Sequence, residues 1–281
     1  MVDVVRAELL KIARRPGTWV LLGAATVLNQ VFGYLVPYLS YRSGDTGDMF
    51  EGAPAEAVLA STAPDQLVGT TIGAFPVFAG ALALVFGALV LGGEHALGTV
   101  KTLLTQRPGR LSVVAGQVVA VVVSLGVAVL VLFALGSTTS YGIATAEGLP
   151  VDWPGAGALA QGFAVGLLVL STWALLGGVL GVLLRGVALP IGLGVVWVLG
   201  IENLVSAMAG SLLSALQPLQ DVLPGVNAGS LVSAAMAERL VEPPPGVVST
   251  VAEPRALATL LAYAVGSAMV AAWVTRRRDV A

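Results

Sequence analysis

The sequence predicts an all-α membrane protein with six transmembrane helices. Of its 281 residues, 57% are hydrophobic and only 11% are charged, whereas soluble domains carry about 25% charged residues. The mean hydropathy is +0.91. Six apolar runs reach the length of about 20 residues that a helix needs to cross a bilayer. Basic and acidic residues also concentrate in different connecting segments, as expected of a chain that crosses a membrane repeatedly.

Residues 1–15 predict an amphipathic helix at the membrane interface. Apolar residues recur at spacings of three and four, and Pro16-Gly17 ends the pattern. Basic residues on the other faces suit contact with anionic headgroups. The alternative is an ordinary positively charged flank of the first span. The apolar stripe is Val2, Val5, Leu9 and Ile12, and the charged faces carry Glu8, Lys11, Arg14 and Arg15.

The spans follow from the apolar runs and the breaks between them. Gly73 and Pro76 interrupt the second span, and the fourth contains two Gly-x-x-x-Gly patterns, at 162–166 and 177–181, which are compatible with close helix packing. Residues 42–64 and 137–154 are expected to be external loops. The predicted spans are residues 18–40, 66–91, 111–136, 156–184, 187–206 and 256–275.

The segment 92–110 between the second and third spans has a pattern of its own. As a helix over 94–105, it places Leu97, Val100 and Leu104 on one stripe, and Pro108-Gly109 ends it. A short amphipathic helix of this kind docks on a partner or, alternatively, lies on the lipid headgroups.

Residues 207–255 are too apolar for a plain loop, and Pro218, Pro224 and Pro243–Pro245 break them too often for a span. We expect short helices that dip into or lie on the outer leaflet, where irregular backbone needs protein or water around it.

Charge predicts the orientation. Of the 14 Lys and Arg residues, eleven fall on one side of the six-span arrangement, whereas eleven of the 16 acidic residues fall on the other. The positive-inside rule then places both termini and segment 92–110 in the cytoplasm.

Segment 92–110 resembles the cytoplasmic loop of type-2 ABC transporter permeases. It shares Glu94, then Gly98-Thr99, a Leu pair, and Pro108 followed by a basic residue. In that family the loop forms a coupling helix that docks on the ATPase subunit. Lys101 departs from a frequently acidic position, and the turn after the helix is short. The resemblance implies a coupling role for Glu94, Leu97, Gly98, Thr99, Val100, Lys101, Leu103, Leu104, Arg107 and Arg110.

The same resemblance extends to the overall plan of the chain. These permeases begin with an interfacial elbow helix and carry re-entrant helices before their last span, which matches residues 1–15 and 207–255. It implies a permease subunit that pairs with a second permease, identical or different, and with ABC ATPase subunits. ATP and magnesium would bind the partner ATPase, and the chain itself would need no cofactor.

The sequence excludes several kinds of chemistry. Without cysteine and with one histidine, His95, it offers no thiolate chemistry and no plausible catalytic zinc site. It contains no Gly-Lys dipeptide and therefore no Walker A motif. His95 has no evident serine partner inside the bilayer. We therefore expect no catalytic residue, no metal site and no nucleic-acid binding.

Polar residues inside the spans are candidates for a translocation path. Glu202 would be an ionisable group within the membrane, which is costly and often functional. The alternative is a solvated carboxylate or one paired with Arg239 or Arg255. The remaining candidates are also common helix–helix hydrogen-bonding residues. The candidates are Asn29, Gln30, Thr70, Thr71, Glu202 and Asn203.

Together these observations favour the membrane subunit of an ABC exporter in the cytoplasmic membrane. Composition and periodicity alone reach only a six-span membrane protein, and the resemblance decides between functions. The alternatives are an ATP-independent secondary carrier or channel and a non-transporting scaffold. No inverted repeat with charged, broken helices favours a carrier. The sequence does not indicate the substrate.

Overall fold

The computed structural model describes residues 2–47, 50, 52–96, 109–211, 214–236 and 241–277. The described residues are helical with no β-strand, and six helical stretches are long and apolar enough to cross a membrane. The predicted fold class is therefore confirmed. The stretches are Pro16–Ser43, Pro64–Glu94, Leu111–Glu147, Ala156–Leu183, Ala188–Ala209 and Glu253–Arg277.

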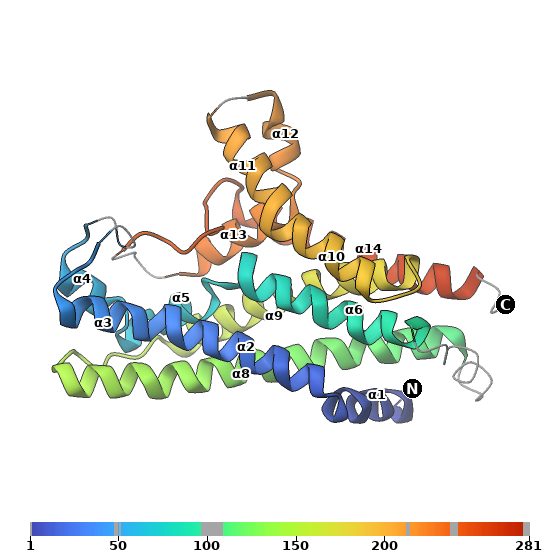
Figure 1. The fold of residues 1–281 in the computed structure, drawn as a ribbon, viewed down its shortest axis with the longest axis horizontal. Coiled ribbons are helices and arrows are strands. Elements are labelled where there is room, and N and C mark those ends of the chain that lie inside the picture. Colours follow the sequence, from blue (N-terminus) through green and yellow to red (C-terminus); the bar gives the residue numbers. More distant parts are fainter. Residues whose placement is uncertain are drawn as a thin grey trace.

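The elements form an elongated bundle with a diagonal arm (Figure 1). The first half comprises α1 (Val2–Arg14), α2 (Pro16–Gln30), η1 (Val31–Leu35), α3 (Val36–Ser43), α4 (Ala55–Ala60), η3 (Pro64–Gln66), α5 (Leu67–Ile72), η4 (Phe75–Ala79), α6 (Gly80–Ala96) and α8 (Arg110–Glu147). The second half comprises α9 (Ala156–Leu183), α10 (Ala188–Val196), η5 (Trp197–Ile201), α11 (Glu202–Ser211), η6 (Ser214–Leu216), α12 (Gln217–Gln220), α13 (Pro224–Ala235) and α14 (Glu253–Arg277).

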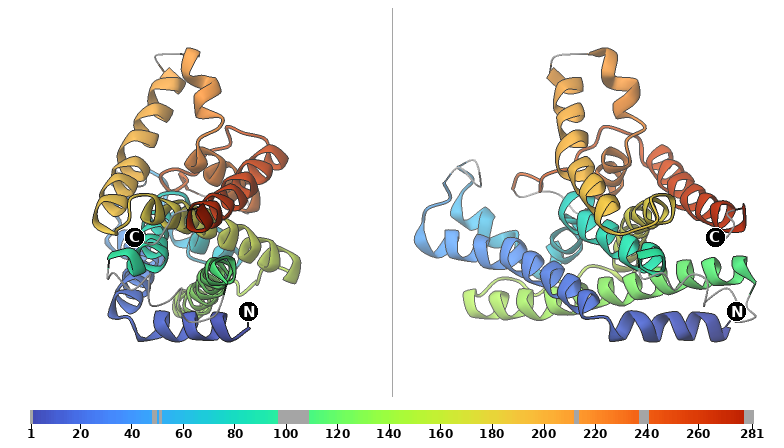
Figure 2. Two further views of the ribbon diagram at one scale, coloured as in Figure 1. Left: turned by 90° about the vertical axis from the view of Figure 1, so that its right-hand side faces the viewer. Right: turned by 45° about the vertical axis from the view of Figure 1, so that its right-hand side comes forward.

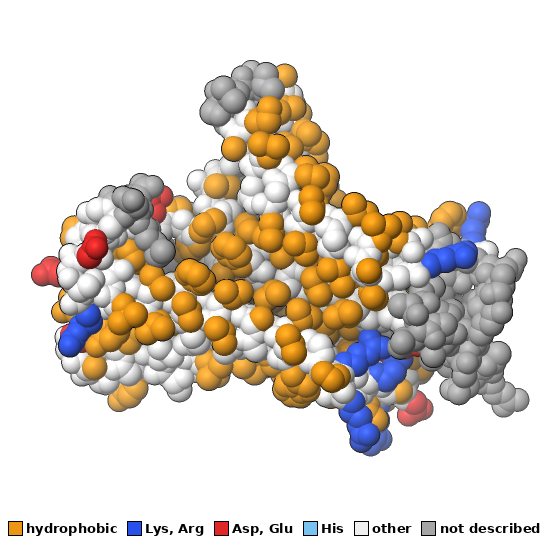
Figure 3. Space-filling model, viewed as in Figure 1, with side chains coloured by type: hydrophobic (Ala, Val, Ile, Leu, Met, Phe, Trp, Pro, Cys, Tyr) orange, Lys and Arg blue, Asp and Glu red, His pale blue; other side chains and the backbone are white. Residues whose placement is uncertain are grey.

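The bundle has two distinct ends. The N-terminal helix, the end of α6, the start of α8 and the end of α14 lie at one end, here called the proximal end (Figure 1). The α3–α4 region and the end of α8 lie at the other, distal end. Hydrophobic side chains cover the middle, and most of the visible Lys and Arg side chains gather near the proximal end (Figure 3). This separation agrees with the charge asymmetry of the sequence.

Helices α6 and α9 form the centre of the bundle, and small residues let their backbones meet. The Cβ of any residue at Gly87 would overlap the carbonyl of Ala174, and one at Gly177 would overlap the carbonyl of Leu84. We call this contact the α6–α9 seam. The fully buried Trp173 of α9 lies beside η4, where its indole N–H donates to the carbonyl of Pro76 at 3.2 Å. That bond satisfies a carbonyl in the broken part of the second span, as backbone within a membrane requires.

Helix α8 is longer than predicted. We expected an external loop from Ser137, but the helix continues to Glu147, so this part of the prediction is wrong. The hydroxyls of Ser137, Thr138 and Thr145 donate to carbonyls one turn earlier, which lets polar residues continue the helix. Its 38 residues span about 57 Å, well beyond the ~30 Å hydrocarbon core of a bilayer.

Two further regions were predicted only in outline. The amphipathic α1 lies crosswise beneath α8 in the left view of Figure 2, with Glu8 and Ile12 buried and Arg6 and Arg14 exposed. Residues 207–255 contain the short elements η6 and α12 and the buried helix α13, which packs on α9, α14 and η4. The stretch α10–η5–α11 forms the arm that rises away from the bundle (Figure 1).

Candidate functional site

An ionic cluster at the proximal end joins the N-terminal helix to the start of segment 92–110. Lys11 of α1 lies between two carboxylates, with its Nζ 2.7 Å from Glu8 Oε1 and 2.8 Å from Glu94 Oε1. Arg15 is the residue directly before α2, and its guanidinium lies 3.7 Å from the same Glu94 oxygen. The Arg15 guanidinium also donates to the carbonyl of Leu89 at 2.8 Å. We call Glu8, Lys11, Arg15 and Glu94 the elbow cluster.

The two carboxylates of the elbow cluster are largely withdrawn from solvent, whereas the side chains of Lys11 and Arg15 are 35% and 30% exposed. Glu8 is 3% exposed and Glu94 is 8% exposed. Burial raises the pKa of Glu8 above its usual value, although Lys11 acts against that shift. Burial alone would lower the pKa of Lys11, but its hydrogen bonds to Glu8 and Glu94 outweigh burial and raise it. Lys11 is thus held in its charged form, which ties α1 to α6.

Most of the predicted coupling residues lie outside the described part of the chain. These are Leu97, Gly98, Thr99, Val100, Lys101, Leu103, Leu104 and Arg107. Arg110 is the first residue of α8, and Glu94 lies three residues before the next undescribed stretch begins at residue 97. The coupling helix itself therefore stays a prediction, while the structure shows what holds its N-terminal flank.

Sequence reasoning missed the partners of Glu94. Lys11 and Arg15 were read only as basic residues facing headgroups, but both contact an acidic residue some 80 positions away along the chain. The sequence did contain a signal for this ion pairing, because Glu94 is one of few acidic residues on the predicted cytoplasmic side, which is rich in Lys and Arg. Gly116 of α8 also packs closely against Val4 of α1. A Cβ at position 116 would lie 2.5 Å from Val4 Cγ1.

The path candidates of the first two spans do meet. Asn29 of α2 donates through Nδ2 to the carbonyls of Thr70 and Thr71 in α5, at 3.1 and 3.2 Å. Gln30 Oε1 accepts a bond from Thr139 of α8 at 2.7 Å. Tyr34, which the sequence reading did not select, is buried beside them at 1% exposure. These contacts are of the helix–helix kind that the sequence left open as an alternative.

Glu202 lies elsewhere, as the first residue of α11, and its side chain reaches the start of α13. Its side chain accepts a hydrogen bond from the backbone N–H of Gly225 at 2.7 Å, and the residue is 4% exposed. Within the described residues it forms no hydrogen bond with Thr70 or Thr71, the neighbours expected from membrane depth. Asn203 donates to the carbonyls of Val198 and Leu199 in its own helical stretch.

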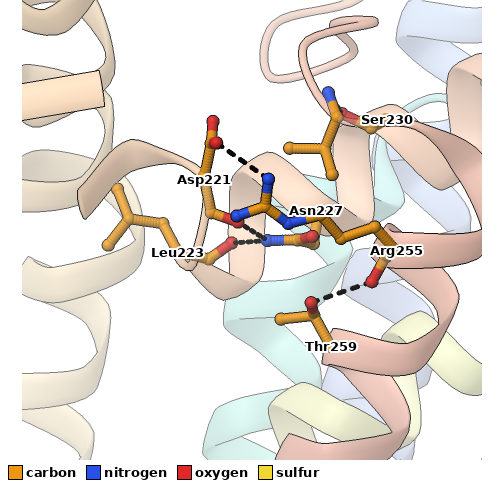
Figure 4. A network of polar contacts seen from close by, with 7 residues as sticks. Asp221, Leu223, Asn227, Ser230, Arg255 and Thr259 are labelled. Carbon is orange, nitrogen blue, oxygen red and sulfur yellow. Dashed lines mark hydrogen bonds and ion pairs between the residues drawn. The ribbon is translucent and has the colours of Figure 1, made fainter. Parts of the chain in front are cut away.

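The alternative pairing of Glu202 with Arg255 is not seen. Arg255 instead forms an ion pair with Asp221 at 3.0 Å, at the turn before α13 (Figure 4). In the same turn Asn227 donates to the carbonyls of Asp221 and Leu223. The other proposed partner, Arg239, lies outside the described residues.

Within the described part of the chain, no cluster of three or more His, Asp or Glu side chains could hold a metal ion.

Comparison with known proteins gives one finding and one negative result. The family described as ABC-2 family transporter protein matches residues 2–280. No curated protein matches the chain. The family match covers the elbow cluster, segment 92–110, all six spans and the short helices before the last span. The chain therefore belongs to the ABC-2 family of transporter membrane proteins.

Proposed function

We propose that this chain is the permease subunit of an ATP-driven exporter whose ATPase is a separate polypeptide. The family match supports a permease role, and the sequence contains no Gly-Lys dipeptide with which to build a Walker A motif. ATP and magnesium would then act on the partner ATPase. The observation that carries the mechanism is the elbow cluster, because it joins segment 92–110 to two other elements.

The elbow cluster would make several elements move together. A force on segment 92–110 reaches Glu94 at the end of α6 first. From Glu94 it passes through Lys11 to α1 and through Arg15 to the first turn of α2. The bond from Arg15 to the carbonyl of Leu89 adds a second tie between α2 and α6. An ATPase docked at this end would therefore displace the first and second spans as a unit.

A second permease subunit would complete the membrane part. The arm α10–η5–α11 exposes large apolar side chains along its length, including Leu189, Leu193 and Val196. In a membrane such a face contacts lipid or another helix. We assign part of it to the second permease, with lipid covering the rest, and place the path for substrate between the two subunits.

The test begins with purification. The tagged chain, extracted from membranes of its own host, should copurify with a protein that contains a Walker A motif and hydrolyses ATP. A preparation without any ATPase, combined with dissipation of an ion gradient in vesicles, would contradict the proposal and favour a secondary carrier.

The elbow cluster is then tested by charge reversal in that complex. Glu94→Lys places three cations around Glu8, namely Lys11, Arg15 and the introduced lysine. We therefore expect the ATPase rate of the complex to equal that of the ATPase without the permease. The double variant Lys11→Glu with Glu94→Lys restores the charge balance and should recover coupling, as a double-mutant cycle would measure. Glu147→Lys at the distal end, which also breaks an ion pair, is the control and should leave the ATPase rate unchanged.

A further inference from the structure

Arg185, in the turn between α9 and α10, is held in a backbone conformation that arginine rarely adopts. Its φ is +54°, and it is the one residue other than glycine with a positive φ in the described part of the chain. Left-handed backbone brings Cβ close to the following carbonyl, so it is disfavoured for every residue that has a Cβ. Such a conformation persists only where the surrounding structure imposes it.

The end of α9 imposes this conformation through a Schellman motif. The backbone N–H of Gly186 donates to the carbonyl of Gly181 at 3.2 Å, and Arg185 is the residue directly after the C-cap of the helix. Helices usually place glycine there, because glycine adopts left-handed backbone without strain. This chain instead has arginine at that position and glycine directly after it. The reverse order would keep the charge and avoid the strain.

The α9–α10 turn is fixed against the end of α6. A Cβ at Gly92 would lie 2.6 Å from the carbonyl oxygen of Gly186, so the two backbones meet directly. At the next residue of α6, a Cβ at Gly93 would lie 3.2 Å from the guanidinium of Arg15. The start of segment 92–110 therefore lies between the elbow cluster and the α9–α10 turn.

The α9–α10 turn presents both charge and apolar surface. Arg185 is exposed, and within the described residues its side chain forms no ion pair or hydrogen bond. Leu183 and Leu184 beside it are 37% and 41% exposed. A protein that docks on segment 92–110 would therefore also come within reach of a fixed guanidinium.

The strained backbone favours a protein partner over lipid. Lipid headgroups are mobile, and a basic residue at either position of the turn reaches them, so they gain nothing from a disfavoured conformation. A protein gains from it, because its carboxylates have fixed positions and a guanidinium binds a carboxylate through two directed hydrogen bonds. We propose that Arg185 is a second docking point for the ATPase subunit, where it binds an acidic side chain of that subunit. This docking point rests on the proposed function, because it needs an ATPase partner.

Moving the charge by one residue tests the docking point. The double variant Arg185→Gly with Gly186→Arg keeps the net charge and places glycine in the left-handed position. A Cβ at Gly186 meets only the carbonyl oxygen of Leu184, at 3.9 Å, so the new side chain has room. We expect the double variant to melt about 2–4 °C above the wild type, because the strain is gone. It should bind the purified ATPase about tenfold more weakly, because the charge pair is lost.

A second variant and a neutral bilayer make the test specific. Arg185→Asn removes the charge with a residue that tolerates left-handed backbone, so it should also weaken binding about tenfold, and it decides alone if the double variant does not fold. The affinity is measured with the permease in discs of neutral phosphatidylcholine, where anionic headgroups are absent. Arg6→Ala, which removes another exposed cation at the proximal end, is the control and should bind the ATPase like the wild type.

Three outcomes would contradict the docking point. Binding of the ATPase by the double variant as tight as by the wild type would overturn it, while the proposed function would stand. A loss of affinity that appears only after anionic lipid is added to the discs would also overturn it and would identify headgroups as the ligand of Arg185. Absence of any ATPase from the wild-type preparation would instead refute the proposed function, and the docking point with it.

Discussion

At the scale of single residues, Glu202 shows why a carboxylate is tolerated inside this protein. A buried carboxylate is expensive unless its oxygens accept hydrogen bonds. Here Gly225 N–H, in the first turn of α13, donates to it, and the positive end of the helix dipole adds to the stabilisation. A Cβ at residue 225 would stand 2.6 Å from Glu202 Oε2, so a larger residue there would make the carboxylate shift. The sequence identified Glu202 as unusual but gave no sign of a partner 23 residues further on.

This arrangement predicts that Glu202 stabilises α13. Glu202→Ala leaves a buried N–H without a partner, which costs about 1–3 kcal/mol, so the protein should melt at a lower temperature. Glu202→Gln retains an acceptor oxygen and should lose less stability than Glu202→Ala. Gly225→Ala should resemble Glu202→Ala, because its methyl group displaces the carboxylate. The measurement is thermal unfolding in detergent.

The matched control for Glu202 is Asp152→Ala, since Asp152 is exposed in the connection before α9. If Glu202→Ala and Asp152→Ala melt alike, Glu202 is not a cap of α13. A place for Glu202 in the translocation path would then regain support.

At the scale of elements, the sequence predicted which residues allow close packing but not which helices they join. The two Gly-x-x-x-Gly patterns of α9 contact different partners. Gly177 and Gly181 meet α6, whereas Gly162 and Gly166 meet Val68 and Phe75 of the broken second span. Sequence spacing describes one face of one helix, and the partner is decided by the fold. The three π-helical turns among the described residues were equally invisible, because a π turn has no sequence signature of its own.

The α6–α9 seam leads to a prediction about Gly177. In an exposed helix, Gly→Ala gains about 0.5–1 kcal/mol. At Gly177 the added methyl group would overlap the carbonyl of Leu84, so the helices must separate and the packing around Trp173 is lost. Gly177→Ala should therefore lower the melting temperature and the yield of folded protein. Gly157→Ala, on the same helix with nothing within 4 Å of its Cβ, should leave both unchanged or improved. Equal behaviour of the two variants would mean that the seam is looser than the structure shows.

At the scale of the whole molecule, hydropathy and charge predicted the six spans, because both depend on composition averaged over many residues. The continuation of α8 to Glu147 was missed, because hydroxyl side chains that bond their own helix look like loop residues in a sequence. The elbow cluster was missed for a different reason. Its four residues come from three elements, and only the folded chain brings Lys11 and Arg15 to Glu94.

The two ends of the molecule predict its orientation. Arg6, Arg14 and Arg185 at the proximal end are exposed, while Glu56 and Asp152 are exposed in the connections before α5 and α9. The positive-inside rule places the proximal end in the cytoplasm. Because the chain has no cysteine, single cysteines report their side without a background signal. Glu56→Cys and Asp152→Cys should react with an impermeant thiol reagent on intact cells.

Arg14→Cys and Gly109→Cys should react only after the membrane is permeabilised. Gly109 is the informative position, because it is exposed and is the last residue before α8, where segment 92–110 ends. A cysteine there meets no other side chain within 4 Å, so the substitution should not disturb the fold. Labelling of Gly109→Cys from outside would place segment 92–110 on the external surface. No cytoplasmic ATPase could then reach it, and the elbow cluster would need a different explanation.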